Sequence, residues 1–230
     1  MIISAIVMGG WKLHSLLNNA ETLPIEAIAV KGERDFTSNA EIQQAMQSLM
    51  QKSFFNVDVN KVQQTLETLP WVYQASVRRE WPAKFKVFLK EQQPIAHWND
   101  TKWLNVHGDV FSALKPSKDI KRLASLPYLY GADSSAQDVL TVYRQINKLL
   151  QINGFGLTTL SFNLRHAWQV TLSNGIKLNL GREDKMARIQ RFINLYPSLE
   201  KMQKPVATLD LRYDTGLAVA WESAQKRAIN

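Results

Sequence analysis

The chain has 230 residues, and 28 lysines and arginines against 20 aspartates and glutamates give it a formal net charge of +8 at pH 7. Hydrophobic residues make up 45% of the chain and aromatic residues 10%, which excludes a disordered chain and predicts a packed body of one large or two small domains. The absence of cysteine excludes disulfides, Cys-ligated zinc and thiol nucleophiles. The positive charge favours nucleic acid, anionic lipid or an acidic protein surface as a partner without choosing among them.

An apolar run opens the chain at residues 1–11 and stops at Lys12. A bilayer span needs about 20 such residues, and this run lacks the basic start and the small-residue cleavage site of a signal peptide. We therefore interpret residues 1–22 as a partial transmembrane helix, whose first part lies upstream of this sequence, and its juxtamembrane connector. A buried helix of a soluble protein is the alternative that the pattern leaves open.

The next segment, residues 23–92, predicts a compact α+β unit with the order strand, helix, helix, strand, strand. Apolar residues alternate in the first strand, which ends at Gly32. Ser38 with Glu41 forms a capping box for the first helix, and Asp58 is a good N-cap for the second. We expect the two helices to pack on one face of a three-stranded sheet.

Cations and aromatic residues are interleaved in the last two strands of this unit, which raises the possibility of a nucleic-acid surface. Alternation argues against it, because Phe85 and its alternate neighbours point to the core while the lysines point to solvent, so that only Phe88 shares the basic face. In the preceding strand we expect Ala75, Val77 and Trp81 to share a face, with Arg79 near the end of the strand and a turn at Trp81-Pro82.

The second half, residues 93–221, has the pattern of a mostly antiparallel β domain with two helices. Turn signals at His107-Gly108 and Asn174-Gly175 predict hairpins. We expect one helix to begin near Ser134, and the other to run from Asp184 to Tyr196, where Pro197 should end it. The last strand ends at Trp221, and residues 222–230 read as a flexible tail.

No motif in the chain points to catalysis, a cofactor or a bound metal. The histidines are scattered, with no pair at the spacing of metal ligands on a helix, and no nucleophile elbow, phosphate loop or dinucleotide fingerprint occurs. Glu183 and Asp184 lie at a predicted helix start, where they complement the dipole. We therefore predict no catalytic residue, no metal site and no cofactor, and a protein that is not an enzyme.

One stretch, "LPWVYQASVRREWPAKFKVFLKEQQPIAHWN", resembles the C-terminal part of a POTRA domain. With "VKGERDFTSNAEI", "WQVTLSNGIKLNLGREDKMARIQRFINLYP" and "VATLDLRYDTGLAVAW", the chain resembles the FtsQ/DivIB family of bacterial cell-division proteins. The resemblance implies a single-pass inner-membrane protein with a periplasmic POTRA domain and a C-terminal β domain, enriched at the division septum. It also implies a non-enzymatic scaffold that binds FtsB and FtsL and joins the septum after FtsK. The alternation of the basic strands, described above, predicts no nucleic-acid partner.

The same resemblance implies contact residues. For the FtsB and FtsL complex these are Arg165, Tyr213, Thr215, Gly216 and Trp221. The last strand would then accept a partner strand at its edge, and Arg165 would bind a carboxylate of the partner. Tyr213 and Trp221 as core aromatics, and Arg165 as a solvated cation, remain the plainer alternatives.

For recruitment through the POTRA domain the implied residues are Gln74, Val77 and Arg79, with Val77 as a core residue the alternative. The rival function is a POTRA chaperone of outer-membrane protein assembly or secretion. Such proteins carry a long run of barrel strands after the POTRA domain, whereas fewer than 140 residues follow Glu91 here and predicted helices interrupt them.

Overall fold

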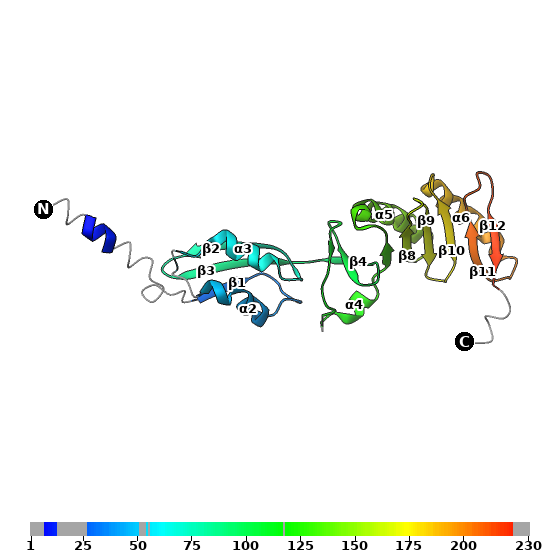
Figure 1. Ribbon diagram of the computed structural model, residues 1–230. Coiled ribbons are helices and arrows are strands. Elements are labelled where there is room, and N and C mark those ends of the chain that lie inside the picture. The colour runs from blue at the N-terminus through cyan, green and yellow to red at the C-terminus, as the bar shows by residue number, and fades with distance from the viewer. Residues whose placement is uncertain (1–6, 13–26, 51–53, 55, 117, 223–230) are drawn as a thin grey trace. The chain divides into compact units, whose positions relative to one another are not determined.

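A computed structural model describes residues 7–12, 27–50, 54, 56–116 and 118–222. These residues form two compact units (Figure 1). The first contains the described residues up to Gln92 together with Ala113–Ile120, and the second contains Gln93–Ser112 and the described residues from Lys121 onward. Residues Ala113–Ile120 thus group with the first unit, although the sequence pattern assigned them to the C-terminal domain.

Residues 7–12 form a short helix whose apolar side chains Val7, Met8 and Trp11 are exposed. Within the described ranges, we find no helix with both the length and the apolar character needed to cross a bilayer. Most of the expected transmembrane segment, residues 1–22, lies outside the described residues.

The first unit has the predicted order of strand, two helices and two strands. Its three-stranded sheet has the order β1-β3-β2, with β3 parallel to β1 and antiparallel to β2. The central strand β3 is therefore hydrogen-bonded on both sides. The elements are β1 (Ala27–Lys31), α2 (Asn39–Met50), α3 (Val59–Glu67), β2 (Val72–Glu80) and β3 (Lys84–Glu91).

Both helix starts are capped as the sequence predicts. Ser38 Oγ accepts from the Glu41 backbone N–H while the Glu41 carboxylate accepts from the Ser38 N–H, which is the reciprocal capping box. Asp58 Oδ1 accepts from the Asn60 N–H at 2.9 Å. The helices cover one face of the sheet, and the core between them includes Ile42, Met46, Val62, Leu66, Ala75, Val77, Phe85, Val87 and Leu89.

The expectation that Trp81 shares a face with Ala75 and Val77 is wrong, because those two residues are buried in the core. The Trp81 side chain is 74% exposed, because β2 ends at Glu80 and the alternation of the strand ends with it. The chain then turns through the cis Trp81-Pro82 bond, and Ala83 is the turn residue that becomes buried.

The second unit is built on a nine-stranded sheet with the order β12-β11-β10-β9-β8-β7-β4-β5-β6 (Figure 1). Most neighbouring strands are antiparallel, as expected, and three pairs are parallel: β10 with β11, β4 with β7, and β7 with β8. Both predicted hairpins form, β5 with β6 and β9 with β10. The strands are β4 (Pro94–Trp98), β5 (Lys102–Asn105), β6 (Val110–Phe111), β7 (Tyr128–Tyr130), β8 (Leu157–Phe162), β9 (Trp168–Leu172), β10 (Lys177–Gly181), β11 (Val206–Asp210) and β12 (Ala218–Trp221).

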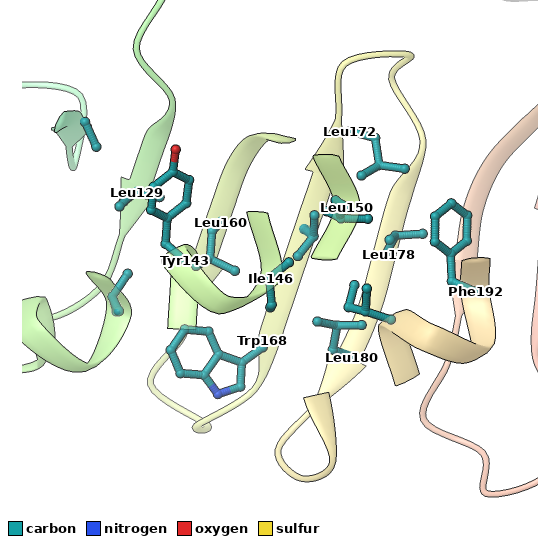
Figure 2. Packing of buried hydrophobic residues seen from close by; sticks show 14 of the residues in the cluster. Leu129, Tyr143, Ile146, Leu150, Leu160, Trp168, Leu172, Leu178, Leu180 and Phe192 are labelled. Atoms are coloured by element: carbon teal, nitrogen blue, oxygen red, sulfur yellow. The ribbon is translucent and has the colours of Figure 1, made fainter. Parts of the chain in front are cut away.

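The helices that follow Gln93 are α4 (Ile120–Ala124), of which all but Ile120 belong to the second unit, the 3-10 turn η1 (Asp133–Ser135), α5 (Ala136–Ile152) and α6 (Lys185–Glu200). The periodic apolar residues of α5 face the sheet, as Figure 2 shows for Tyr143, Ile146 and Leu150 beside the strand residues Leu160 and Leu178. Burial of these apolar residues holds α5 against the centre of the sheet.

Helix α6 does not end before Pro197, as its sequence predicts. It continues to Glu200, with Pro197 inside it. Proline removes the hydrogen bond to the Ile193 carbonyl, but Leu199 beyond it is only 7% exposed and belongs to the core. Packing of the last turn therefore outweighs the local signal. At the other end Asp184 has a left-handed φ of 51° and its side chain makes no capping hydrogen bond.

The carboxylate of Glu91, at the end of β3, organises the loop before α2. It accepts hydrogen bonds from the backbone N–H groups of Asp35 at 2.8 Å, Thr37 at 2.6 Å, and Phe36. We predict that Glu91→Ala lowers the free energy of unfolding of the first unit by about 2 kcal/mol, since the three donors lose a charged acceptor. Native-state hydrogen exchange of α2 and β3 in urea measures this loss. Glu80→Ala, at an exposed position, is the matched control, and equal exchange in the two variants would refute the assignment.

Candidate functional site

The end strand β12 offers an open hydrogen-bonding edge. Among the described residues it pairs with β11 alone, and it is the last strand in the sheet order. The opposite end strand, β6, has two residues, against four in β12. An end strand presents N–H and C=O groups to which another extended chain can bind.

The direction of the donors along β12 follows from one hydrogen bond. The Glu222 N–H donates to Pro205 O at 2.9 Å, toward β11. Because successive N–H groups of a strand point to opposite sides, those of Trp221 and Val219 point away from β11. These two donors, with the carbonyls beside them, form the open edge. The Val219 side chain packs on the core while Ala218 and Ala220 are exposed.

The segment between β11 and β12, residues 211–217, is held by a guanidinium group from α6. Arg191 Nη1 donates to the carbonyls of Gly216 at 3.3 Å and Leu211 at 3.5 Å, and also to that of Tyr213. Leu211 is fully buried, and its N–H donates to Asn179 O at 3.0 Å. These bonds fix the path by which the chain enters β12.

Asp210 and Arg212 form an ion pair at the start of the same segment. Arg212 Nη2 lies 2.6 Å from Asp210 Oδ2, and its Nε contacts both carboxylate oxygens. Hydrogen bonding from Arg212 lowers the pKa of Asp210, against the opposing effect of partial burial. Because the pKa of Asp210 is lower in the folded state, the pair stabilises the fold at pH values above the ordinary pKa of a carboxyl group. This stabilisation is lost as the pH falls through the lowered pKa.

The expected contact residues near β12 are accessible. Tyr213 is 58% exposed and Trp221 36% exposed, so neither is a fully buried core aromatic. Thr215 is exposed and Gly216 half-buried. Gly216 lies outside the left-handed region, and a Cβ added to it would meet open space, so its backbone does not require glycine.

Arg165 lies at the same end of the sheet as the segment 211–217. It precedes β9, whose first residue, Trp168, pairs with Gly181 at the end of β10. Since β10 and β11 are parallel, the end of β11 and the residues after it lie at that end too. Arg165 is exposed, and its backbone N–H donates to Asn163 Oδ1 at 2.9 Å. Trp221 lies at the other end of β12, opposite Val206.

The three POTRA residues share strand β2 but do not form one surface. Gln74 is exposed on the face opposite the helices, whereas Val77 is 8% exposed and belongs to the core. The buried position of Val77 agrees with the alternative that it is a core residue. Arg79 is exposed but turns back to the helix side, where its guanidinium donates to Val57 O and lies 5.8 Å from the Phe54 ring.

Local hydrogen-bonded pairs shift the pKa values of two further groups, Asp133 and Tyr130. Hydrogen bonds from Lys102 and Trp98 lower the pKa of Asp133, and a hydrogen bond to Asp100 raises the pKa of Tyr130 to about 12. In the part of the chain that the structure describes, no three histidine, aspartate or glutamate side chains gather as metal ligands would.

Comparison with known proteins identifies the family. A model of the FtsQ/DivIB cell division protein C-terminal domain matches residues 96–212, and a model of the FtsQ-type POTRA domain matches residues 23–92. Cell division protein FtsQ of Shewanella oneidensis is 61% identical over 227 residues, which cover 99% of this chain and 85% of that protein. The chain belongs to the FtsQ/DivIB family. The family resemblance drawn from the sequence is confirmed.

Two further members of the FtsQ/DivIB family have lower identity and similar coverage. Cell division protein FtsQ of Escherichia coli is 39% identical over 96% of this chain and 81% of that protein. The protein of the same name from Vibrio cholerae is 34% identical over 98% of this chain and 86% of that protein.

Two features of this FtsQ-type C-terminal domain escaped sequence reasoning. Arg191 reads in the sequence as one more cation of an amphipathic helix, and nothing local indicates that it binds three carbonyls of a distant segment. Leu164, beside Arg165, is 94% exposed. The sequence did indicate that Leu164 is exposed, since an apolar residue in the polar turn "NLRH" is unusual.

We predict that Arg191→Met speeds amide hydrogen exchange in residues 211–221 about tenfold, because three carbonyls lose their donor while the apolar stem is kept. The matched control is Gln190→Met, at the exposed neighbouring position. Exchange resolved by mass spectrometry measures both. Equal exchange of the segment in the two variants would show that Arg191 does not hold it.

Proposed function

We propose that the protein is a non-enzymatic scaffold of the cell-division machinery that binds FtsB and FtsL through the open edge of β12. It is anchored by one transmembrane helix in the inner membrane, with its POTRA and C-terminal domains in the periplasm and enriched at the division septum. The observation that carries the proposal is the outward donor row of Val219 and Trp221 beside exposed aromatic side chains. Family membership supports the role in division.

A partner strand would add to β12 by backbone hydrogen bonds, while side chains at the two ends of β12 select the partner. Tyr213 and Trp221 offer apolar area with a polar tip, as residues at the centre of interfaces do. Arg165 would bind a carboxylate through paired N–H donors. Thr215 and Gly216 lie beside Tyr213 in the segment that Arg191 holds.

The other sheet is less suited to strand addition along its end strand β2. In β2 the Ala75 N–H donates to Glu67 Oε1 at 3.0 Å, so a side chain of α3 occupies part of that edge. We therefore propose that recruitment contacts to FtsK and other division proteins involve exposed side chains of β2, with Gln74 on one face and Arg79 on the other. Val77 supports them from the core.

We predict that Val219→Pro abolishes capture of FtsB, since proline removes an outward donor and blocks the approach of a strand. Val219→Ala is the matched control, because it loses a comparable part of the side chain but keeps the N–H, and it should still bind. Pull-down with the FtsB and FtsL complex measures both. Capture by the proline variant at the level of the alanine variant would exclude strand addition at this edge.

We predict that Arg165→Glu or Tyr213→Ala leaves the C-terminal domain folded but abolishes pull-down of FtsB, since both side chains are exposed and neither stabilises the core. In cells depleted of the protein, each variant should fail to restore division, leaving filaments without constrictions. The matched control is Lys177→Glu, at another exposed cation. Normal division with an altered outer membrane on depletion would instead favour the chaperone function.

A further inference from the structure

One face of the POTRA sheet carries a concentration of positive charge. The helices cover the other face, and the residues that alternate with the core on β1, β2 and β3 point outward. Among the described outward positions, Glu80 is the one carboxylate. The cations, which we call the basic sheet face, are Lys31, Arg78, Lys84, Lys86 and Lys90.

The register sets like charges opposite each other on this face. Arg78 pairs with Lys86 across β2 and β3, an arrangement that destabilises an antiparallel sheet. Lys84 lies opposite Glu80 and is balanced, whereas Lys90 lies opposite Gln74. A bound anionic surface would remove the repulsion between Arg78 and Lys86.

Aromatic side chains accompany the cations. Phe88, on the same face, is 40% exposed, and Lys86 Nζ lies 5.8 Å from the centre of its ring. Lys90 Nζ lies 5.2 Å from the Tyr73 ring. Trp81, at the turn between β2 and β3, is 74% exposed. Lysine stems with exposed aromatic rings are typical of surfaces that meet the headgroup layer of a membrane.

We propose that the basic sheet face docks on an anionic lipid bilayer through phosphate headgroups. The cations belong mostly to the central strand β3, whose backbone is paired on both sides, so a peptide cannot bind beside them by strand addition to β3. The charges extend from Lys84 to Lys90, a length of about 20 Å along the strand, which suits a broad charged surface more than a single carboxylate.

The connectivity of the chain also favours a lipid bilayer as the partner of this face. The unit's first strand begins at Ala27, and the exposed apolar helix of residues 7–12 precedes it. The intervening residues span at most about 50 Å, so a membrane that takes up the apolar residues lies within reach of the sheet. The inference rests on the proposed membrane anchoring for its location, but not on the binding of FtsB or FtsL.

The test compares flotation of the full chain on neutral phosphatidylcholine vesicles and on vesicles that also contain phosphatidylglycerol. The ratio of the two affinities isolates the part that depends on lipid charge, because the apolar residues contribute to both. We expect the triple variant Lys84→Gln, Lys86→Gln, Lys90→Gln to reduce this ratio roughly 100-fold, about fivefold per lysine, and salt to reduce the wild-type ratio as well.

The matched control replaces three exposed lysines of the second unit, Lys177, Lys201 and Lys204, by glutamine, which changes the net charge equally. It should keep the ratio. Equal losses in both triple variants would overturn the proposal, since net charge alone would then explain binding. An unchanged ratio in the first variant, with loss of binding to a poly-glutamate peptide, would overturn it in favour of an acidic protein partner.

A second measurement needs no variant. Acetylation of lysine amines in the wild-type chain should slow about tenfold at Lys84, Lys86 and Lys90 on anionic vesicles relative to neutral ones, and remain unchanged at Lys177. Uniform rates at all four lysines would refute docking of this face. Variants of β12 that fail to capture FtsB should keep the flotation ratio, so failure of the proposed function and failure of this inference are distinguishable.

Discussion

The end strand of a β-sheet has N–H and C=O groups without a partner strand, and the structure of the second unit depends on this constraint. The order of the nine strands ends in β12, and the outward N–H groups of Val219 and Trp221 either remain solvated or bind another chain. The same need for partners explains Arg191, whose guanidinium satisfies three carbonyls in the segment that enters β12. One edge is thus left open while the segment beside it is fixed, which lowers the ordering cost of strand addition.

The end strands β2 and β12 differ in whether side chains of the same unit bind their backbone donors. In the first unit a glutamate from α3 binds a backbone donor of β2, and a glutamate at the end of β3 binds three donors of the loop before α2. Both carboxylates occupy groups that would otherwise attract an extended chain or water. In β2 at least one backbone donor of the end strand is therefore already bound by a side chain of the same unit. In the C-terminal unit the edge itself is available.

Sequence reasoning predicted what depends on local signals. The capping box of Ser38 and Glu41, the hairpin at Asn174-Gly175 and the alternation of Phe85, Val87 and Leu89 each follow from residues within one element, and each is present. It went wrong where tertiary packing decides. Leu199 holds α6 together beyond Pro197, and the end of β2 at Glu80 leaves Trp81 outside. Arg191 could not be predicted, because its three carbonyl partners are brought to it only by the return of the chain after β11.

Strand alternation gives the central strand β3 two separate roles. Its buried residues hold α2 and α3, while its outward residues carry most of the charge of the opposite face, so the surface can change without altering the core. The repulsion between opposed cations such as Arg78 and Lys86 destabilises the sheet, and packing of the buried core on the other face offsets it. The chain therefore carries its charged side chains and its open backbone donors on different features: the charges lie on a sheet face of the first unit, and the donors lie on a sheet edge of the second. Because a face and an edge bind by different groups, a ligand at one does not compete for the groups of the other.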